Sequence, residues 1–162
     1  MAAIGLRELI DAHYEMLYRY AYRLSGNAAD SEDLVQEAFG KAMTRMDQLR
    51  NPDFVKPWLY RILRNIYLHR VRDEKRHRVI PLESAGELAA KQDSEVPMIE
   101  PERLQAALDE LEESFRSPLI LYYFEGFSYR EIAEQMDLPI GTVMSRLARA
   151  KSYLRTKLSD QS

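Results

Sequence analysis

Apolar residues recur at three- and four-residue intervals along most of this chain, and no stretch shows the strict alternation that a half-buried β-strand requires. Glycine, which interrupts such patterns, occurs only 6 times in 162 residues. The spacing therefore predicts an all-α protein. In the N-terminal part it predicts three amphipathic helices, at about 6–24, 31–49 and 57–76.

A stretch of different character, from Pro81 to Pro101, divides the helical pattern. It holds three of the seven prolines, among glutamate, serine, alanine and glycine residues. Such a composition buries little surface and is typical of a linker. We expect two small helical domains, at 1–80 and 102–162, joined by a flexible linker at 81–101.

The second domain is expected to open with an amphipathic helix near Glu102. Ser117 and Pro118 predict the start of the next helix, because serine is a good N-cap and proline suits the first helical turn. Gly126 is expected to end that helix.

The net charge of −3 conceals segments of opposite sign. Residues 54–80 carry 8 basic and 2 acidic side chains, whereas residues 81–115 carry 2 basic and 10 acidic ones. Residues 116–157 are basic again, with 7 basic and 4 acidic side chains. Two basic segments separated by an acidic one predict two separate contacts with a polyanion.

Composition argues against several classes of function. No run of about eighteen apolar residues is present, so no membrane insertion is expected, and the N-terminus lacks a secretory pattern. A cytoplasmic protein is predicted. Without cysteine, and with three histidines in no ligand spacing, neither a metal site nor another cofactor is expected. No nucleophile–base motif is present, so an enzyme is not expected.

A helix-turn-helix is predicted near the C-terminus. Ser128 and Glu131 form a capping box, in which each side chain accepts a hydrogen bond from the backbone N–H of the other residue. The short helix that follows is broken at 137–139, and a last helix begins near Gly141. Two helices joined by so short a turn are typical of this DNA-binding motif.

The last helix combines a buried stripe with a polar, cationic strip. The residues expected to be buried are Val143, Leu147, Ala150 and Leu154. The residues of the strip, which could enter a major groove, are Thr142, Ser145, Arg146 and Arg149. Lys151 and Arg155 are expected to add phosphate contacts. Solvated charges on an ordinary amphipathic helix are the alternative, but the capping box and turn favour DNA binding.

The first basic segment places an aromatic residue among arginines. The residues expected on the side of helix 57–76 away from the core are Trp58, Arg61, Arg64 and Asn65. A flat ring beside cations suits unpaired bases, which stack on aromatic side chains. An equally weighted interpretation is that Trp58 only covers the core.

The helix predicted at 31–49 begins with an acidic, exposed half. Asp33, Gln36 and Glu37 lie one turn apart there. Acids at this end favour the helix dipole, and the same side chains could form a docking patch for a basic protein. Composition does not decide between these interpretations.

Four segments of the chain resemble bacterial sigma factors. Residues 30–39 (DSEDLVQEAF) resemble their core-polymerase-binding segment, and residues 57–65 (PWLYRILRN) resemble their promoter-melting helix. Residues 128–134 (SYREIAE) and 139–150 (PIGTVMSRLARA) resemble the two halves of their C-terminal helix-turn-helix. In length, order and spacing the chain resembles the extracytoplasmic-function group of the sigma-70 family.

This resemblance implies a role for each set of residues. Those implied to face the coiled coil of the largest subunit of core RNA polymerase are Asp33, Gln36, Glu37 and Phe39. Those implied to capture a flipped base of the −10 element, to open the duplex and to hold the single strand are Asn51, Asp53, Trp58, Arg61, Arg64 and Asn65. Those implied to read the duplex −35 element are Thr142, Ser145, Arg146 and Arg149.

The resemblance further implies a function in transcription initiation, with an anti-sigma factor as a partner. Two departures concern the helix-turn-helix. Met144 stands where the family often has a lysine or arginine, and Asp137 stands where the turn usually has glycine. Aspartate tolerates the left-handed conformation that such a turn needs. A stand-alone helix-turn-helix regulator is the alternative. It leaves unexplained the acidic segment at 33–37 and the segment at 58–65 that places a tryptophan among arginines (the Trp-Arg segment).

Overall fold

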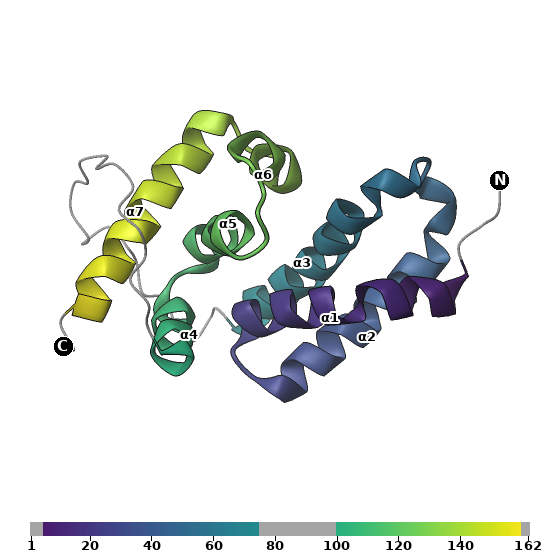
Figure 1. The fold of residues 1–162 in the computed structure, drawn as a ribbon, viewed down its shortest axis with the longest axis horizontal. Coiled ribbons are helices and arrows are strands. Elements are labelled where there is room, and N and C mark those ends of the chain that lie inside the picture. Colours follow the sequence, from purple (N-terminus) through teal and green to yellow (C-terminus); the bar gives the residue numbers. More distant parts are fainter. Residues whose placement is uncertain (1–4, 75–99, 160–162) are drawn as a thin grey trace. The chain divides into compact units, whose positions relative to one another are not determined.

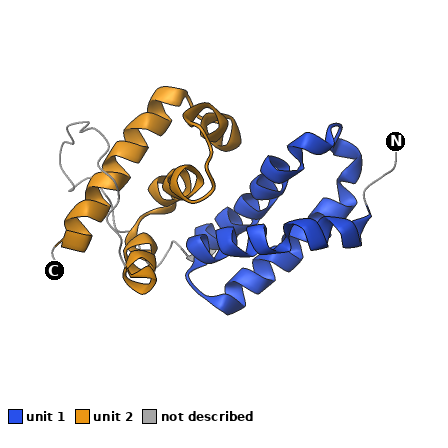
Figure 2. Ribbon diagram, viewed as in Figure 1, with its two compact units in different colours: residues 1–76 blue, residues 77–162 orange. Residues whose placement is uncertain are grey.

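The computed structural model describes residues 5–74 and 100–159, and every regular element in these two ranges is a helix (Figure 1). The chain divides into two compact units, residues 1–76 and 77–162 (Figure 2). The predicted all-α fold with two helical domains is confirmed. Of the predicted linker, only Glu100 and Pro101 lie within the described residues, so the linker and the exact domain limits stay predictions.

Unit 1 contains α1 (Leu6–Ser25), α2 (Ala28–Thr44) and α3 (Val55–Glu74), with two 3-10 turns, η1 (Met46–Gln48) and η2 (Pro52–Phe54), between α2 and α3. Each of the three helices packs against the other two. Between α1 and α3 the fully buried rings of Tyr20 and Tyr60 lie with their centroids 4.6 Å apart. Such a pair contributes about 0.5–1.5 kcal/mol beyond its buried area. It helps to fix α3, which carries the Trp-Arg segment.

The start of α2 differs from the prediction by three residues. Gly26 ends α1 in the left-handed conformation, and Asn27 caps α2 by accepting the N–H of Asp30 at 2.8 Å. Ser31, expected at the helix start, is instead fully buried and bonds to the carbonyl of Asn27. At the other end the regular helix stops at Thr44 and not near residue 49, and Met43 in its last turn is 58% exposed.

Unit 2 contains α4 (Pro101–Glu110), α5 (Glu113–Tyr123), α6 (Tyr129–Met136) and α7 (Ile140–Ser159). The last helix contacts all three others. Its buried side chains are the four that the spacing predicted. Because α7 is the central element of this unit, its position is determined by packing along its whole length.

The predicted start of α5 is wrong. The helix begins at Glu113, and Pro118 lies inside it. Ser117 is fully buried, and its hydroxyl donates to the carboxylate of Glu113 instead of capping the helix. The apolar residues that follow the proline are buried, and this burial outweighs the one backbone hydrogen bond that proline removes.

A carboxylate at the end of α4 connects this helix to α7. Glu110 accepts hydrogen bonds from Nζ of Lys157 at 2.9 Å and from the hydroxyl of Tyr153 at 2.7 Å. These two interactions lower the pKa of Glu110. Burial, together with the bond to Glu110, raises the pKa of Tyr153 to about 12. Tyr153 therefore remains a neutral donor at physiological pH.

Within the described ranges, no helix is both long enough and apolar enough to cross a membrane. The same ranges contain no group of three histidine or acidic side chains that could hold a metal ion.

Candidate nucleic-acid and protein interfaces

The helix-turn-helix has the local geometry that the sequence predicted. At the start of α6 the hydroxyl of Ser128 accepts the N–H of Glu131 at 3.1 Å, and the Glu131 carboxylate accepts the N–H of Ser128 at 2.8 Å. At its end Asp137 takes the left-handed conformation, with φ 58° and ψ 50°. The N–H of Leu138 bonds back to the carbonyl of Ala133 at 2.9 Å. Both ends of α6 are thus fixed by hydrogen bonds before α7 begins.

Loss of the capping box is expected to loosen this motif. Ser128→Ala removes the acceptor for the Glu131 N–H and should cost about 1 kcal/mol. That corresponds to a drop of about fivefold in protection of the α6 amides from hydrogen exchange. Ser128→Asp keeps an acceptor at the cap and should retain most of the protection. Equal protection in the alanine variant and the parent would contradict this account.

The polar strip of α7 is not uniformly exposed. Ser145 is exposed, whereas Thr142, Arg146 and Arg149 are half-buried. The guanidinium carbon of Arg149 lies 5.8 Å from the centroid of the Phe115 ring, which belongs to α5. A cation over an aromatic face is held in place by the negative potential of the ring. Arg149 is therefore oriented by a side chain outside the motif.

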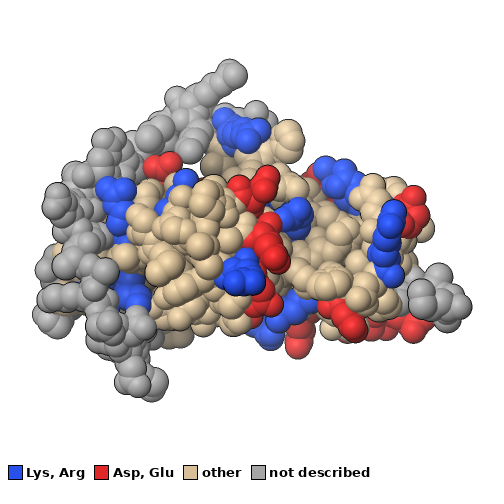
Figure 3. Space-filling model, turned by 90° about the horizontal axis from the view of Figure 1, so that it is seen from above, with Lys and Arg blue, Asp and Glu red and all other residues tan. Residues whose placement is uncertain are grey.

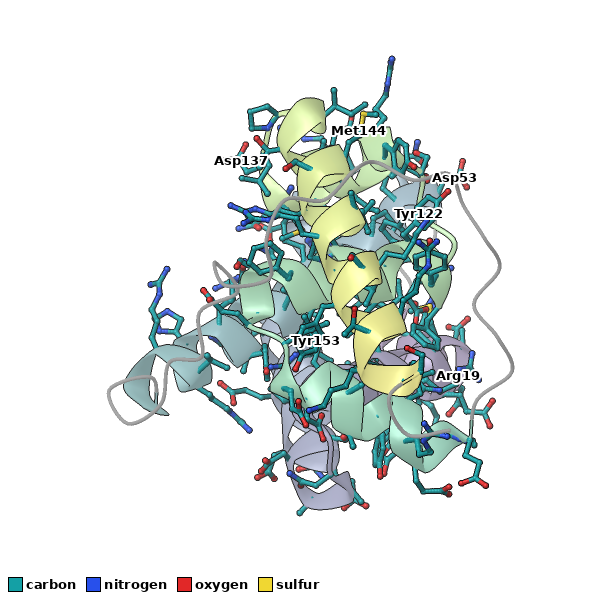
Figure 4. All side chains as sticks on the ribbon, turned by 90° about the vertical axis from the view of Figure 1, so that its left-hand side faces the viewer. Arg19, Asp53, Tyr122, Asp137, Met144 and Tyr153 are labelled. Atoms are coloured by element: carbon teal, nitrogen blue, oxygen red, sulfur yellow. The ribbon has the colours of Figure 1, made fainter. Side chains whose placement is uncertain are left out.

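Two large apolar residues on α7 were missed as candidate contacts. Ile140 is 45% exposed and Met144 is 49% exposed. Figure 4 shows Met144 at the same end of α7 as the turn that holds Asp137. In a major groove such side chains can pack against the methyl group of thymine. In the sequence, both residues fall outside the helical spacing of the buried stripe of α7, and this position indicated that they would be exposed.

The two residues expected to contact phosphates lie partly against the protein. Nζ of Lys151 is 5.4 Å from the ring centroid of Tyr123. Arg155 is half-buried, and its Nη2 has no hydrogen-bond partner among the described residues. Both would have to extend to reach a DNA backbone.

The surface of α3 agrees only in part with the predicted face. Arg61 and Asn65 are exposed and Trp58 is half-buried, but Arg64 is only 8% exposed. The expectation that Arg64 shares the exposed face is wrong. Because α3 packs against both α1 and α2, its buried stripe is wider than the spacing of its aliphatic residues suggested.

The loop before α3 presents both predicted residues and one that was missed. Asn51 and Asp53 are exposed, and Oδ1 of Asn51 accepts the N–H of Asp53 at 2.9 Å. Phe54, in the same 3-10 turn as Asp53, is 61% exposed. An exposed aromatic ring beside polar groups can stack on an unpaired base. In the sequence Phe54 resembles the apolar residues of the core, so its exposure could not be recognised there.

The acidic face of α2 is exposed, with one exception. Asp33, Gln36 and Glu37 are exposed, whereas Phe39 is 4% exposed and lies beneath the surface against the ring of Tyr14. The expectation that Phe39 faces a partner is therefore wrong. The carboxylate of Glu37 accepts a hydrogen bond from Arg70 of α3 at 2.8 Å.

Comparison with known proteins gives matches in both units. The family model Sigma-70 region 2 matches residues 9–77, and Sigma-70, region 4 matches residues 102–154. The chain is 38% identical, over 96% of its length, to the ECF RNA polymerase sigma factor SigE of Mycolicibacterium smegmatis, and spans 62% of that relative's length. It is 36% identical, over 95% of its length, to the ECF RNA polymerase sigma factor EcfG of Rhodopseudomonas palustris, of which it spans 85%.

Solved structures give the same result. The sigma factor RpoE in complex with the anti-sigma factor NepR from Bartonella quintana is similar with a TM-score of 0.75 and 26% identity, over 96% of this chain and 98% of that one. CnrH in complex with the cytosolic domain of CnrY is similar with a TM-score of 0.67 and 27% identity, over 97% and 89% of the two chains.

Proposed function

Because this chain belongs to the ECF sigma factors of the sigma-70 family, we propose that it directs core RNA polymerase to specific promoters and assists promoter melting. The observation that carries this proposal is the presence of both family regions in one chain. A stand-alone helix-turn-helix regulator would account for residues 102–154 and leave 9–77 without a use. Such a factor acts through binding energy, as a DNA-binding initiation factor and not as an enzyme, and its place is the cytoplasm.

Docking on the polymerase is assigned to α2. Asp33, Gln36 and Glu37 form an exposed face with two carboxylates, and it suits a basic surface such as the coiled coil of the largest polymerase subunit. Charge pairs across such an interface accelerate association and select the partner. Phe39 supports this face from below, through its packing on α1.

Recognition and melting of the −10 element are assigned to η2 and the outer side of α3. Asn51 and Asp53 offer hydrogen-bonding groups to a flipped base, and Phe54 offers a ring for stacking. Trp58, Arg61 and Asn65 continue this surface along α3. Arg64 contributes from within the helix packing and not through direct contact.

Reading of the −35 element is assigned to α7. Arginine can bond guanine bidentately, and the hydroxyls of Thr142 and Ser145 can reach bases or phosphates. Arg146 and Arg149 are the base-reading candidates, and Met144 adds an apolar contact beside them. Lys151 and Arg155 are assigned to the DNA backbone.

An anti-sigma factor is a further proposed partner. Two of the similar structures are complexes, one of RpoE with the anti-sigma factor NepR and one of CnrH with the cytosolic domain of CnrY. This chain is similar to RpoE and to CnrH over most of its length, so a protein partner of the kind that NepR is for RpoE fits it.

Reconstituted transcription tests the proposed function directly. Purified core polymerase and this protein should together start transcripts at a defined position on a cognate promoter, with permanganate-reactive thymines marking the melted region. Core polymerase alone, and the protein alone, are the controls. A stand-alone regulator would give no initiation with core alone and an effect only when another sigma factor is added; that result would overturn the proposal.

A further inference from the structure

A hollow of about 310 Å³ lies between α2 and α3 in unit 1. Its rim is formed by Lys41 of α2, by Arg45 directly after α2, and by Asn65, His69 and Arg72 of α3. Its floor is apolar and includes Ile62 and Ile66, which are 4% and 3% exposed. This volume is at the lower end of the range of small-molecule sites, about 300–1,000 Å³. The hollow is therefore large enough for a fragment the size of a nucleotide.

The charge of this hollow is of one sign. Three cations and an imidazole border it, and none of the acidic side chains that the structure describes does. Among the described residues, no carboxylate forms an ion pair with Lys41, Arg45 or Arg72. Elsewhere both signs of charge are present, as on the face drawn in Figure 3. Cations that converge on a hollow with apolar walls focus a positive potential and attract an anion.

We propose that this hollow binds a backbone phosphate of promoter DNA. The inference rests on the proposed function and extends it to residues of α2 and the C-terminal half of α3. Asn65 belongs both to the hollow and to the surface assigned to melting, so a strand on that surface passes the rim. Lys41, Arg45 and Arg72 hold the phosphate, and the apolar floor packs against the adjoining sugar.

The salt dependence of DNA binding by the holoenzyme tests this assignment. Removing a cation that contacts one phosphate lowers the steepness of log affinity against log salt concentration by about 1. This decrease is the same for every DNA sequence. The ratio of the parent's DNA affinity to that of the variant should therefore change by about fourfold between 50 and 200 mM salt. The variant is Arg45→Gln with Arg72→Gln, and the expected loss is the same on promoters that differ at the −35 element.

Matched variants keep the test specific. Arg7→Gln with Arg19→Gln removes the same charge from two exposed positions on α1, away from the hollow, and should leave the slope unchanged. Arg45→Lys with Arg72→Lys keeps the cations and should retain the parent slope. An unchanged slope in the glutamine variant overturns the inference. So does a loss of affinity for core polymerase with normal DNA binding, since the hollow then binds protein.

A free nucleotide is the other source of the same chemistry. A titration of the protein with a mononucleotide or with inorganic phosphate tests for binding of a free anion. The readout is the amide chemical shifts of α2 and α3. Saturable shifts around the hollow together with an unchanged salt slope would assign the site to a free anion and overturn the DNA assignment. The parent protein from the same preparation must also start transcription with core polymerase. Failure of the proposed function is then distinguished from failure of the phosphate assignment.

Discussion

Reversal of two charges on α2, by Asp33→Lys together with Glu37→Lys, is expected to abolish promoter-specific initiation. Both carboxylates are exposed on the face assigned to the polymerase, and lysines there would meet a basic partner surface. Like charges juxtaposed across an interface cost several kcal/mol, which corresponds to a loss of roughly 100-fold or more in affinity. Competition for core polymerase, followed by fluorescence anisotropy, measures this loss.

A closely matched control exists on α1. Asp11→Lys with Glu15→Lys has the same spacing and the same change in net charge, at two exposed positions on another helix. It should bind core polymerase almost as the parent does. Because Glu37 also pairs with Arg70, Arg70→Ala separates loss of this ion pair from loss of docking. Equal effects of the α1 and α2 reversals would show that net charge, and not the α2 face, governs assembly.

Removal of either arginine from the strip of α7 is expected to relax promoter selectivity. Arg146→Ala and Arg149→Ala should each cost about 1–3 kcal/mol on the cognate −35 sequence if the side chain bonds a base bidentately. The loss should be much smaller on a promoter altered at the contacted base pair. Arg149→Lys keeps the charge but lacks the planar fork, so it should lose selectivity as well.

Lys151→Ala provides the contrast for these arginines. Removing a cation that binds a phosphate should weaken binding to all sequences alike and lower the salt slope by about 1. Binding of the isolated protein or the holoenzyme to a panel of promoter variants distinguishes the two patterns. Unchanged selectivity in both arginine variants, with normal helix content, would place the reading face elsewhere on α7, and Met144 would then be the first residue to examine.

The features that the sequence predicted well are those with a local cause. The capping box of Ser128 and Glu131 and the left-handed Asp137 depend on neighbouring residues only, so their chemistry can be recognised in a short stretch of sequence. The buried stripe of α7 follows in the same way from helical spacing.

The features that were missed depend on packing between distant segments. Arg64 is buried because α1 and α2 both cover α3, and Phe39 is buried because α1 supplies Tyr14 against it. In α5, local signals pointed to Ser117 as a cap, and burial of the following apolar run determined otherwise. The hollow between α2 and α3 joins Lys41 to Arg72, and no local pattern connects two residues so far apart in the chain.

The contact between Arg149 and Phe115 has a consequence for how promoter preference can change. The arginine lies on α7, and the ring that orients it lies on α5. If Arg149 reads a base as proposed, a substitution at Phe115 is expected to redirect its guanidinium while every residue of α7 is retained. Promoter preference would then have a second route of change, through the residue that supports Arg149. On the same premise, two related chains with identical α7 sequences and different residues at position 115 would differ in their preference for the −35 element.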